Sequence, residues 1–199
     1  MKKKIAITGG IGSGKSTAAK IIQELGFPIY SCDEIYKEII QSPEYIKQIK
    51  QKFPICVNQG TIDRAKLSEI VFNNPIRRKE LDNIAHPLIM QKLNESMEST
   101  AEDIVFAEVP LLFEGGFASA FDYIIIILRS IENRIQSIVA RDNLPIEAIN
   151  KRIHAQFDYS KENIDKLSRK FPIIIIENEE NVESLKTNIK QSLQKLQVL

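Results

Sequence analysis

The chain has 199 residues, enough for one well-packed core, so its length favours a single domain with room for an insertion. Its 27 Lys and Arg against 26 Asp and Glu leave a formal net charge of +1, without the basic excess typical of proteins that bind duplex nucleic acid. A hydrophobic content of 43% argues against a disordered chain. The longest purely apolar run (123–128) is too short to cross a bilayer, and two cysteines are too few for a disulfide scaffold. We therefore expect a cytoplasmic protein with no nucleic-acid or membrane partner.

Short apolar runs alternate with amphipathic segments, which predicts an α/β fold around a parallel sheet. In chain order, strands are expected at 4–8, 27–30, 104–108, 123–128 and 173–176. The last three are near-continuous apolar runs, as strands covered on both faces require. Helices are expected at 15–25, from near Asp33, after caps at Ser130 and Ser160, from Pro145 as a first helical residue, and from about Asn181.

Seventy residues, 33–102, separate the second and third strands, which is more than one crossover helix needs and predicts a helical subdomain. Within it, the cap-plus-proline pairs at 42–43 and 74–75 predict helix starts, and Phe53-Pro54 predicts a stop. From Pro75 the apolar spacing predicts one long helix. The single domain then comprises a core (about 1–40, 101–140 and 170–199), a helical insertion (about 41–100) and a lid region (about 141–169).

Residues 9–16 match the phosphate-binding loop pattern G-x-x-x-x-G-K-[ST] in full, between an expected strand and an expected helix. The glycines let backbone N–H groups turn inward around phosphate oxygens, where the helix N-terminus adds positive potential. The pattern places Lys15 for the β- and γ-phosphates and the Ser16 hydroxyl for Mg²⁺. The alternative is a glycine-rich turn without a ligand; the strand before it and the helix after it favour nucleotide binding.

The sequence lacks the D-x-x-G and N-K-x-D motifs of GTPases and the L-S-G-G signature of transporter ATPases. A short chain with a large insertion after the second strand has the layout of a kinase whose core binds ATP and whose insertion binds a small acceptor. A kinase for another acceptor, such as a nucleoside monophosphate or a sugar acid, is the nearest rival. A nucleotide-dependent switch without catalysis is the rival from another class.

A kinase needs a base for the acceptor hydroxyl and positive charge around the moving phosphoryl group. Asp33 follows the second strand at the carboxyl edge of the sheet, where it is either this base or a helix cap. Glu108 ends the third strand and either holds Mg²⁺ through water or is satisfied by backbone N–H groups. Arg134 and Arg141 share one helical face, and Arg141 either belongs to a mobile lid or is a solvated surface residue.

Several further motifs resemble one family, the dephospho-coenzyme A kinases, over most of the chain. The resemblance is carried by 7–17, Leu25-Gly26, Ser31-Cys32-Asp33, Asp63-Arg64-Ala65 with Val71-Phe72, 84–89, 109–114, Arg134, Arg141-Asp142 and 152–156. Many P-loop kinases share the first motif, whereas His86-Pro87 combined with the run 110–114 is much more specific.

The resemblance implies a P-loop kinase fold with a five-stranded parallel sheet, a helical acceptor-binding domain and a lid. It implies transfer of the γ-phosphate of ATP to the ribose 3′-hydroxyl of dephospho-CoA, the last step of coenzyme A biosynthesis, with ATP as co-substrate. Together with the loop pattern it gives the candidate residues. Catalytic candidates are Asp33, Lys15 and Arg141; nucleotide-binding ones are Gly10, Ile11, Gly12, Ser13, Gly14, Lys15, Ser16, Thr17 and Asn178; substrate-binding ones are Thr8, Asp33, Arg64 and His86; Mg²⁺ ligands are Ser16 and Glu108.

Two departures from the family pattern affect these assignments. Ser31 stands where the family has the first of its two Asp residues, so that carboxylate's role is either weakened or filled by the hydroxyl. The stretch 170–178 differs from the family's late motif, so Asn178 either approaches adenine or is a polar strand end. For His86 the alternatives are ligand contact and a packing or helix-capping role before Pro87. The sequence leaves the oligomeric state open.

Overall fold

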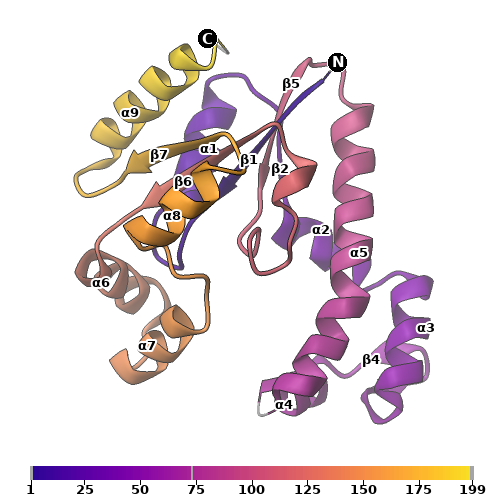
Figure 1. Ribbon diagram of the computed structural model, residues 1–199. Helices are drawn as coiled ribbons and strands as arrows, with labels where there is room; N and C mark the ends of the chain where they lie inside the picture. The colour runs from indigo at the N-terminus through magenta and orange to yellow at the C-terminus, as the bar shows by residue number, and fades with distance from the viewer. Residues whose placement is uncertain (1, 73, 198–199) are drawn as a thin grey trace. The chain divides into compact units, whose positions relative to one another are not determined.

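A five-stranded parallel sheet forms the centre of the fold in a computed structural model that describes residues 2–72 and 74–197 (Figure 1). Its strands are β1 (Lys3–Thr8), β2 (Ile29–Ser31), β5 (Ile104–Glu108), β6 (Tyr123–Leu128) and β7 (Ile173–Glu177), in the order β2-β5-β1-β6-β7. Ile5 of the central strand pairs with Phe106 on one side and Tyr123 on the other. The expected α/β fold with a parallel sheet is confirmed. Because the strands are parallel, their carboxyl ends share one edge, where ligands bind in such folds.

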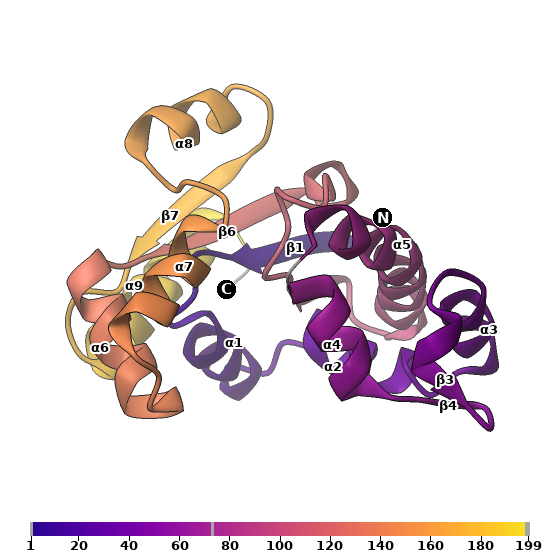
Figure 2. The ribbon, with the colours of Figure 1, turned by 90° about the horizontal axis from the view of Figure 1, so that it is seen from below.

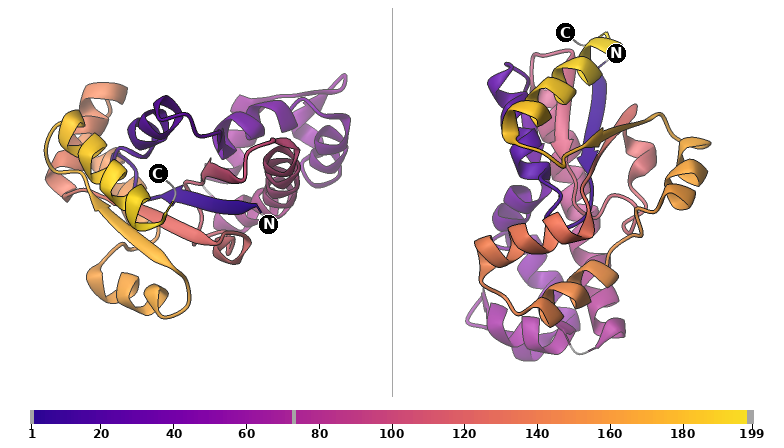
Figure 3. Two further views of the ribbon diagram at one scale, coloured as in Figure 1. Left: turned by 90° about the horizontal axis from the view of Figure 1, so that it is seen from above. Right: turned by 90° about the vertical axis from the view of Figure 1, so that its left-hand side faces the viewer.

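The helices α1 (Lys15–Glu24) and α9 (Val182–Lys195) cover one face of the sheet, and α8 (Lys161–Ser168) lies on the other side (Figures 2 and 3). The core between α1, α9 and the sheet includes Ile7, Ile22 and Ile127, all inaccessible to solvent. The short helix η2 (Ala118–Ala120) precedes β6, and α6 (Ile131–Asp142) and α7 (Ile146–His154) follow it. Since β1 and α1 are both anchored in this core, the loop between them is held at both ends.

The edge strand β7 departs from the expectation that the late strands are covered on both faces. Ile175, in the middle of β7, is 47% exposed, whereas Ile124 to Ile127 of β6 are wholly buried. An all-isoleucine run does not reveal whether a strand lies at the centre or the edge of a sheet, because both are compatible with the same local preference for extended backbone.

The chain divides into two compact units, one formed by the residues up to Ile29 and from Thr100 onward, the other by Tyr30–Ser99. The second unit thus begins earlier than residue 41, where the sequence placed the start of the insertion. Its elements are α2 (Cys32–Ile39), α3 (Pro43–Lys52), η1 (Pro54–Cys56), β3 (Val57–Asn58), β4 (Thr61–Ile62), α4 (Arg64–Phe72) and α5 (Pro75–Ser99). None of the helices described combines the length and the apolar character needed to span a membrane.

Local signals account for most helix boundaries in the second unit. Ser42 Oγ accepts from the backbone N–H of Tyr45 at 3.2 Å, and Asn74 Oδ1 accepts from that of Arg77 at 3.1 Å, so both expected caps are present. The hairpin β3–β4 was not expected, although Gln59 and Gly60 at its tip both have positive φ, and glycine is a recognised turn signal. In the other unit, Pro145 is the N-cap of α7 rather than its first residue.

Candidate active site

The loop between β1 and α1, residues 9–16, needs glycine at three positions for steric reasons. Gly9 has a φ of +146°, and a Cβ there would collide with the carbonyl oxygen of Ile127. Gly12 and Gly14 have φ of +79° and +96°, in the left-handed region that side chains disfavour. A Cβ at Gly12 would also lie 2.7 Å from the carbonyl oxygen of Arg134. Gly14 is the N-cap of α1, so the N–H groups at the start of this helix lie at the end of the loop, where they can bind an anion.

Lys15 and Ser16 begin α1 at the carboxyl edge of the sheet. The Lys15 ammonium is almost buried and donates to the carbonyl oxygens of Gly9 (2.9 Å) and Gly10 (3.1 Å), so the cation sits directly against the loop. Ser16 Oγ donates a hydrogen bond of 2.8 Å to Oε1 of Glu108, the last residue of β5. A hydroxyl and a carboxylate at this spacing are the hard oxygen ligands that Mg²⁺ prefers.

The fit for Mg²⁺ depends on phosphate as well as protein. Among residues 2–72 and 74–197, no group of three or more His, Cys, Asp or Glu side chains could hold a metal ion. Mg²⁺ is commonly held by one or two protein oxygens together with substrate phosphates and waters, so the Ser16–Glu108 pair beside a phosphate loop suits this ion.

Arg134, on α6, lies against the outside of the loop. Its Nε donates to the carbonyl oxygen of Ile11 at 2.8 Å, and a Cβ at Gly10 would collide with its guanidinium. Burial lowers the pKa of Arg134, and the neighbouring Tyr159 opposes that shift. An arginine stays charged at neutral pH despite such a shift, so the loop has a second fixed cation beside Lys15.

A short segment after α7, residues 156–159, contacts the phosphate loop and the end of β1, although it lies more than a hundred residues away in the sequence. Gln156 Oε1 accepts the backbone N–H of Ile11 at 2.6 Å, and the Tyr159 hydroxyl lies 3.2 Å from Thr8 Oγ1. Thr8 is wholly buried, so its hydroxyl is engaged inside the protein. Burial raises the pKa of Tyr159 to about 12, which keeps this phenol neutral.

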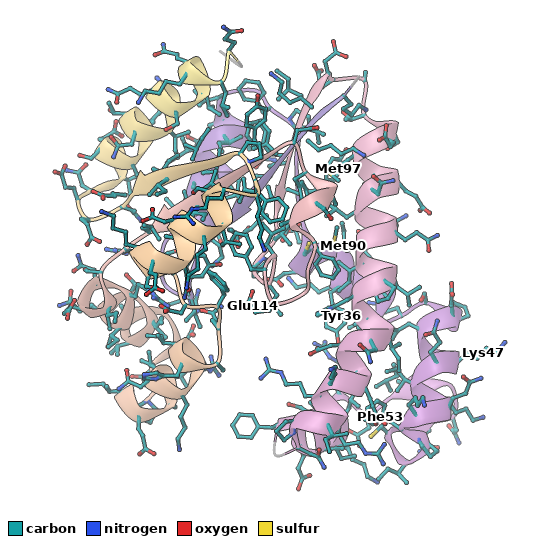
Figure 4. All side chains as sticks on the ribbon, viewed as in Figure 1. Tyr36, Lys47, Phe53, Met90, Met97 and Glu114 are labelled. Carbon is teal, nitrogen blue, oxygen red and sulfur yellow. The ribbon has the colours of Figure 1, made fainter. Side chains whose placement is uncertain are left out.

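The same segment is anchored to the loop that follows β5. The backbone N–H of Phe157 donates to Glu114 Oε1 at 2.7 Å, and Figure 4 labels Glu114. The rings of Phe113, Phe157 and Tyr159 form a cluster with centroids 4.9 to 6.1 Å apart. Sequence reasoning connected neither Tyr159 nor Phe157 with the site, because no local pattern marks contacts between segments so far apart in the chain.

A cavity of about 260 Å³ lies beside the loop, lined by Gly12, Gly14, Lys15, Ser16, Thr17, Arg129, Ser137, Ile138 and Arg141. Arg141 binds Asp142 through two hydrogen bonds of 2.7 and 2.9 Å, which raise its pKa. It therefore takes part in a surface ion pair and also lines the cavity. Arg129 was missed by the sequence analysis, although it directly follows β6 at the carboxyl edge; its Nη1 donates to Ser137 Oγ at 2.7 Å.

Asn178, directly after β7, holds the loop from the side of the sheet. Its Nδ2 donates to the carbonyl oxygen of Ser13 at 2.8 Å, and a Cβ at Gly14 would collide with this amide. Asn178 is only 9% exposed, so this bond is shielded from water. Its neighbour Glu179 accepts from the Ser130 hydroxyl and from Asn133, both at 2.8 Å, and thereby ties the end of β7 to the start of α6.

Apart from Thr8, the acceptor-side candidates belong to the unit Tyr30–Ser99. Asp33 is exposed in the first turn of α2, whose N-cap is Ser31, so the alternative that Asp33 itself caps this helix is wrong. Arg64 is the first residue of α4. His86 lies one turn from Asp82 on α5, with Nε2 3.9 Å from Asp82 Oδ1.

Comparison with known proteins agrees with this geometry. A family model described as dephospho-CoA kinase matches residues 3–183. A dephospho-CoA kinase from Fusobacterium nucleatum is 36% identical over 183 residues, covering 91% of this chain and 92% of that protein. A crystal structure from Thermus thermophilus superposes with a TM-score of 0.81 at 30% identity, and dephospho-CoA kinase from Campylobacter jejuni with 0.67 at 30%, each covering 98% of both chains. The chain therefore belongs to the dephospho-CoA kinase family, whose members catalyse the final, ATP-dependent step of coenzyme A biosynthesis.

Proposed function

We propose that this chain transfers the γ-phosphate of ATP to the ribose 3′-hydroxyl of dephospho-CoA and releases CoA and ADP. One observation carries the proposal: a phosphate loop with a buried lysine and a Ser16–Glu108 pair, in a chain that matches the dephospho-CoA kinase family over residues 3–183. Both substrates are small molecules, and because they are cytoplasmic metabolites we expect the reaction in the cytoplasm.

The nucleotide is assigned to the loop side. The backbone N–H groups of Gly10, Ile11, Gly12, Ser13, Gly14, Lys15, Ser16 and Thr17 would hold its phosphates. Lys15 would exchange its two loop carbonyls for β- and γ-phosphate oxygens, and Arg134 and Arg141 would stabilise charge on the transferred group. Asn178 is assigned to nucleotide binding through the loop carbonyl that it holds. Because Gln156 takes the N–H of Ile11, phosphate must displace that side chain to use this donor.

Ser16, together with Glu108 through a water, would hold Mg²⁺. When bound, this ion neutralises the charge that develops on the β- and γ-phosphate oxygens. The protein's own part is to hold these two oxygen ligands, at the start of α1 and the end of β5, within hydrogen-bond distance of each other before the nucleotide arrives.

The acceptor is assigned to the second unit. Asp33 would accept the proton of the 3′-hydroxyl as the new O–P bond forms and the bond between the β–γ bridging oxygen and the γ-phosphorus breaks. Its exposure in the first turn of α2 leaves the carboxylate accessible to a ligand. Arg64 and His86 would contact the acceptor, whereas Thr8, being buried against Tyr159, would act on the substrate only through the loop that it precedes.

The test is ADP release from ATP and Mg²⁺ by the purified protein, with and without dephospho-CoA, followed by mass spectrometry of the acceptor. We expect one phosphate to be added to dephospho-CoA and none to AMP or adenosine. ADP release that does not depend on dephospho-CoA, or transfer to another acceptor, would contradict the proposal. ATP binding without transfer to any acceptor would favour a nucleotide-dependent switch.

A further inference from the structure

The unit Tyr30–Ser99 contains an open cavity of about 570 Å³ that is lined by residues of this unit alone and by none of the phosphate loop. Its size falls in the range of roughly 300 to 1,000 Å³ that is usual for small-molecule sites. One wall is a single face of α4, since Arg64, Leu67, Ser68 and Val71 lie three to four residues apart along that helix. The hairpin β3–β4, α2, α3 and α5 supply further lining residues, Ile46 being the one from α3.

The lining is apolar or uncharged with one exception. Among the lining residues that the structure describes, Arg64 alone carries a charge, and it stands at the first position of α4. Tyr36 lines the cavity from α2, and Figure 4 shows it beside α5. Its hydroxyl lies 3.2 Å from that of Tyr45, which is wholly buried, so the ring of Tyr36 is a fixed part of the wall.

This pattern matches one portion of the proposed acceptor. Dephospho-CoA joins adenosine, through two phosphates, to a long uncharged arm with a geminal dimethyl group, two amides and a terminal thiol. A mostly apolar cavity with hydroxyls such as that of Ser68 suits the uncharged arm. Its single cation, Arg64, suits the phosphates at the end of that arm. We infer that this cavity binds the pantetheine arm of the acceptor and that Arg64 contacts the adjoining diphosphate, an inference that rests on the proposed function.

The experiment varies both the cavity and the acceptor. Ser68→Phe fills the cavity from an exposed position of α4, and Ala65→Phe places the same side chain on α4 at an exposed residue that does not line the cavity. Each variant and the unmodified chain are assayed with dephospho-CoA and with the β-methyl ester of ADP, in which a methyl group replaces the arm. Circular dichroism verifies that the variants are folded.

We expect Ser68→Phe to lower kcat/KM for dephospho-CoA by about tenfold or more, the effect of losing one or two methylene-sized groups from an apolar pocket. It should leave kcat/KM for the methyl ester within about twofold, and Ala65→Phe should change neither value. Equal losses with both acceptors, or equal efficiency of the two acceptors with the unmodified chain, would overturn the inference.

A second readout separates this inference from the proposed function. Calorimetric titration measures dephospho-CoA binding without any transfer. If the unmodified chain transfers phosphate to dephospho-CoA but Ser68→Phe binds it as tightly as Ala65→Phe does, the arm site is refuted while the proposed function stands. If the unmodified chain phosphorylates neither acceptor, the proposed function fails, and the arm site fails with it. Should Ser68→Phe not fold, Thr61→Trp, which changes an exposed lining residue of the hairpin, takes its place.

Discussion

Replacing Asn178 by Ala tests whether this residue acts on the nucleotide by holding the phosphate loop. The substitution removes the 2.8 Å bond from Nδ2 to the Ser13 carbonyl and leaves that carbonyl without this donor at a site where Asn178 is only 9% exposed. Loss of a buried hydrogen-bond partner costs about 1–3 kcal/mol. For a chain of this length we expect the melting temperature to fall by roughly 2–4 °C per kcal/mol.

If the nucleotide binds only to the loop conformation that Asn178 stabilises, the free energy lost in this variant should also lower the affinity for the nucleotide. A loss of about 1.4 kcal/mol in binding free energy corresponds to a tenfold larger dissociation constant. We expect ATP and inorganic tripolyphosphate, which lacks adenine and ribose, to lose affinity by similar factors in calorimetric titrations. Asn188→Ala is the matched control, because Asn188 is less buried than Asn178 and donates to the Glu177 carbonyl at a longer 3.3 Å. Weaker ATP binding with unchanged tripolyphosphate binding would refute the bracing role and indicate a contact with adenine.

Three further substitutions test other parts of the site. Lys15→Ala should reduce both ATP affinity and turnover, because it removes the cation held against the loop carbonyls; unchanged steady-state kinetics would contradict the loop assignment. Asp33→Asn should lower kcat by about 10²–10⁴ with ATP affinity nearly unchanged, as expected for a general base, and activity within a few-fold would remove that role. Tyr159→Phe should destabilise the fold by about 1 kcal/mol through loss of the Thr8 contact. Burial raises the pKa of Tyr159 to about 12, above the ordinary tyrosine pKa of about 10. The stabilisation by the neutral phenol is therefore fully present below about pH 10 and is lost as the pH rises toward 12. In urea unfolding, the difference in unfolding free energy between wild type and variant should shrink over that range.

Local sequence patterns predicted much of the fold because they depend on neighbouring residues only. The full phosphate-loop pattern at 9–16, the apolar strands and the proline that begins α5 at Pro75 are all signals of this kind. The family resemblance from motifs across the chain is confirmed by the match over residues 3–183. The missed hairpin β3–β4 shows the limit of such signals, since its strands are two residues long and too short for a periodic pattern.

The sequence by itself determined the fold class and the nucleotide loop, because periodicity and glycine spacing restrict the backbone directly. Its motifs gave the family by resemblance. Only the tertiary structure decided what holds that loop: Asn178 reaches Ser13, Gln156 reaches Ile11 and Tyr159 reaches Thr8 across more than a hundred residues of chain. It also decided that β7 is an edge strand and that one face of α4 lines a cavity. Such contacts follow from strand order, register and packing, which depend on the whole chain and leave no mark in the spacing of adjacent residues.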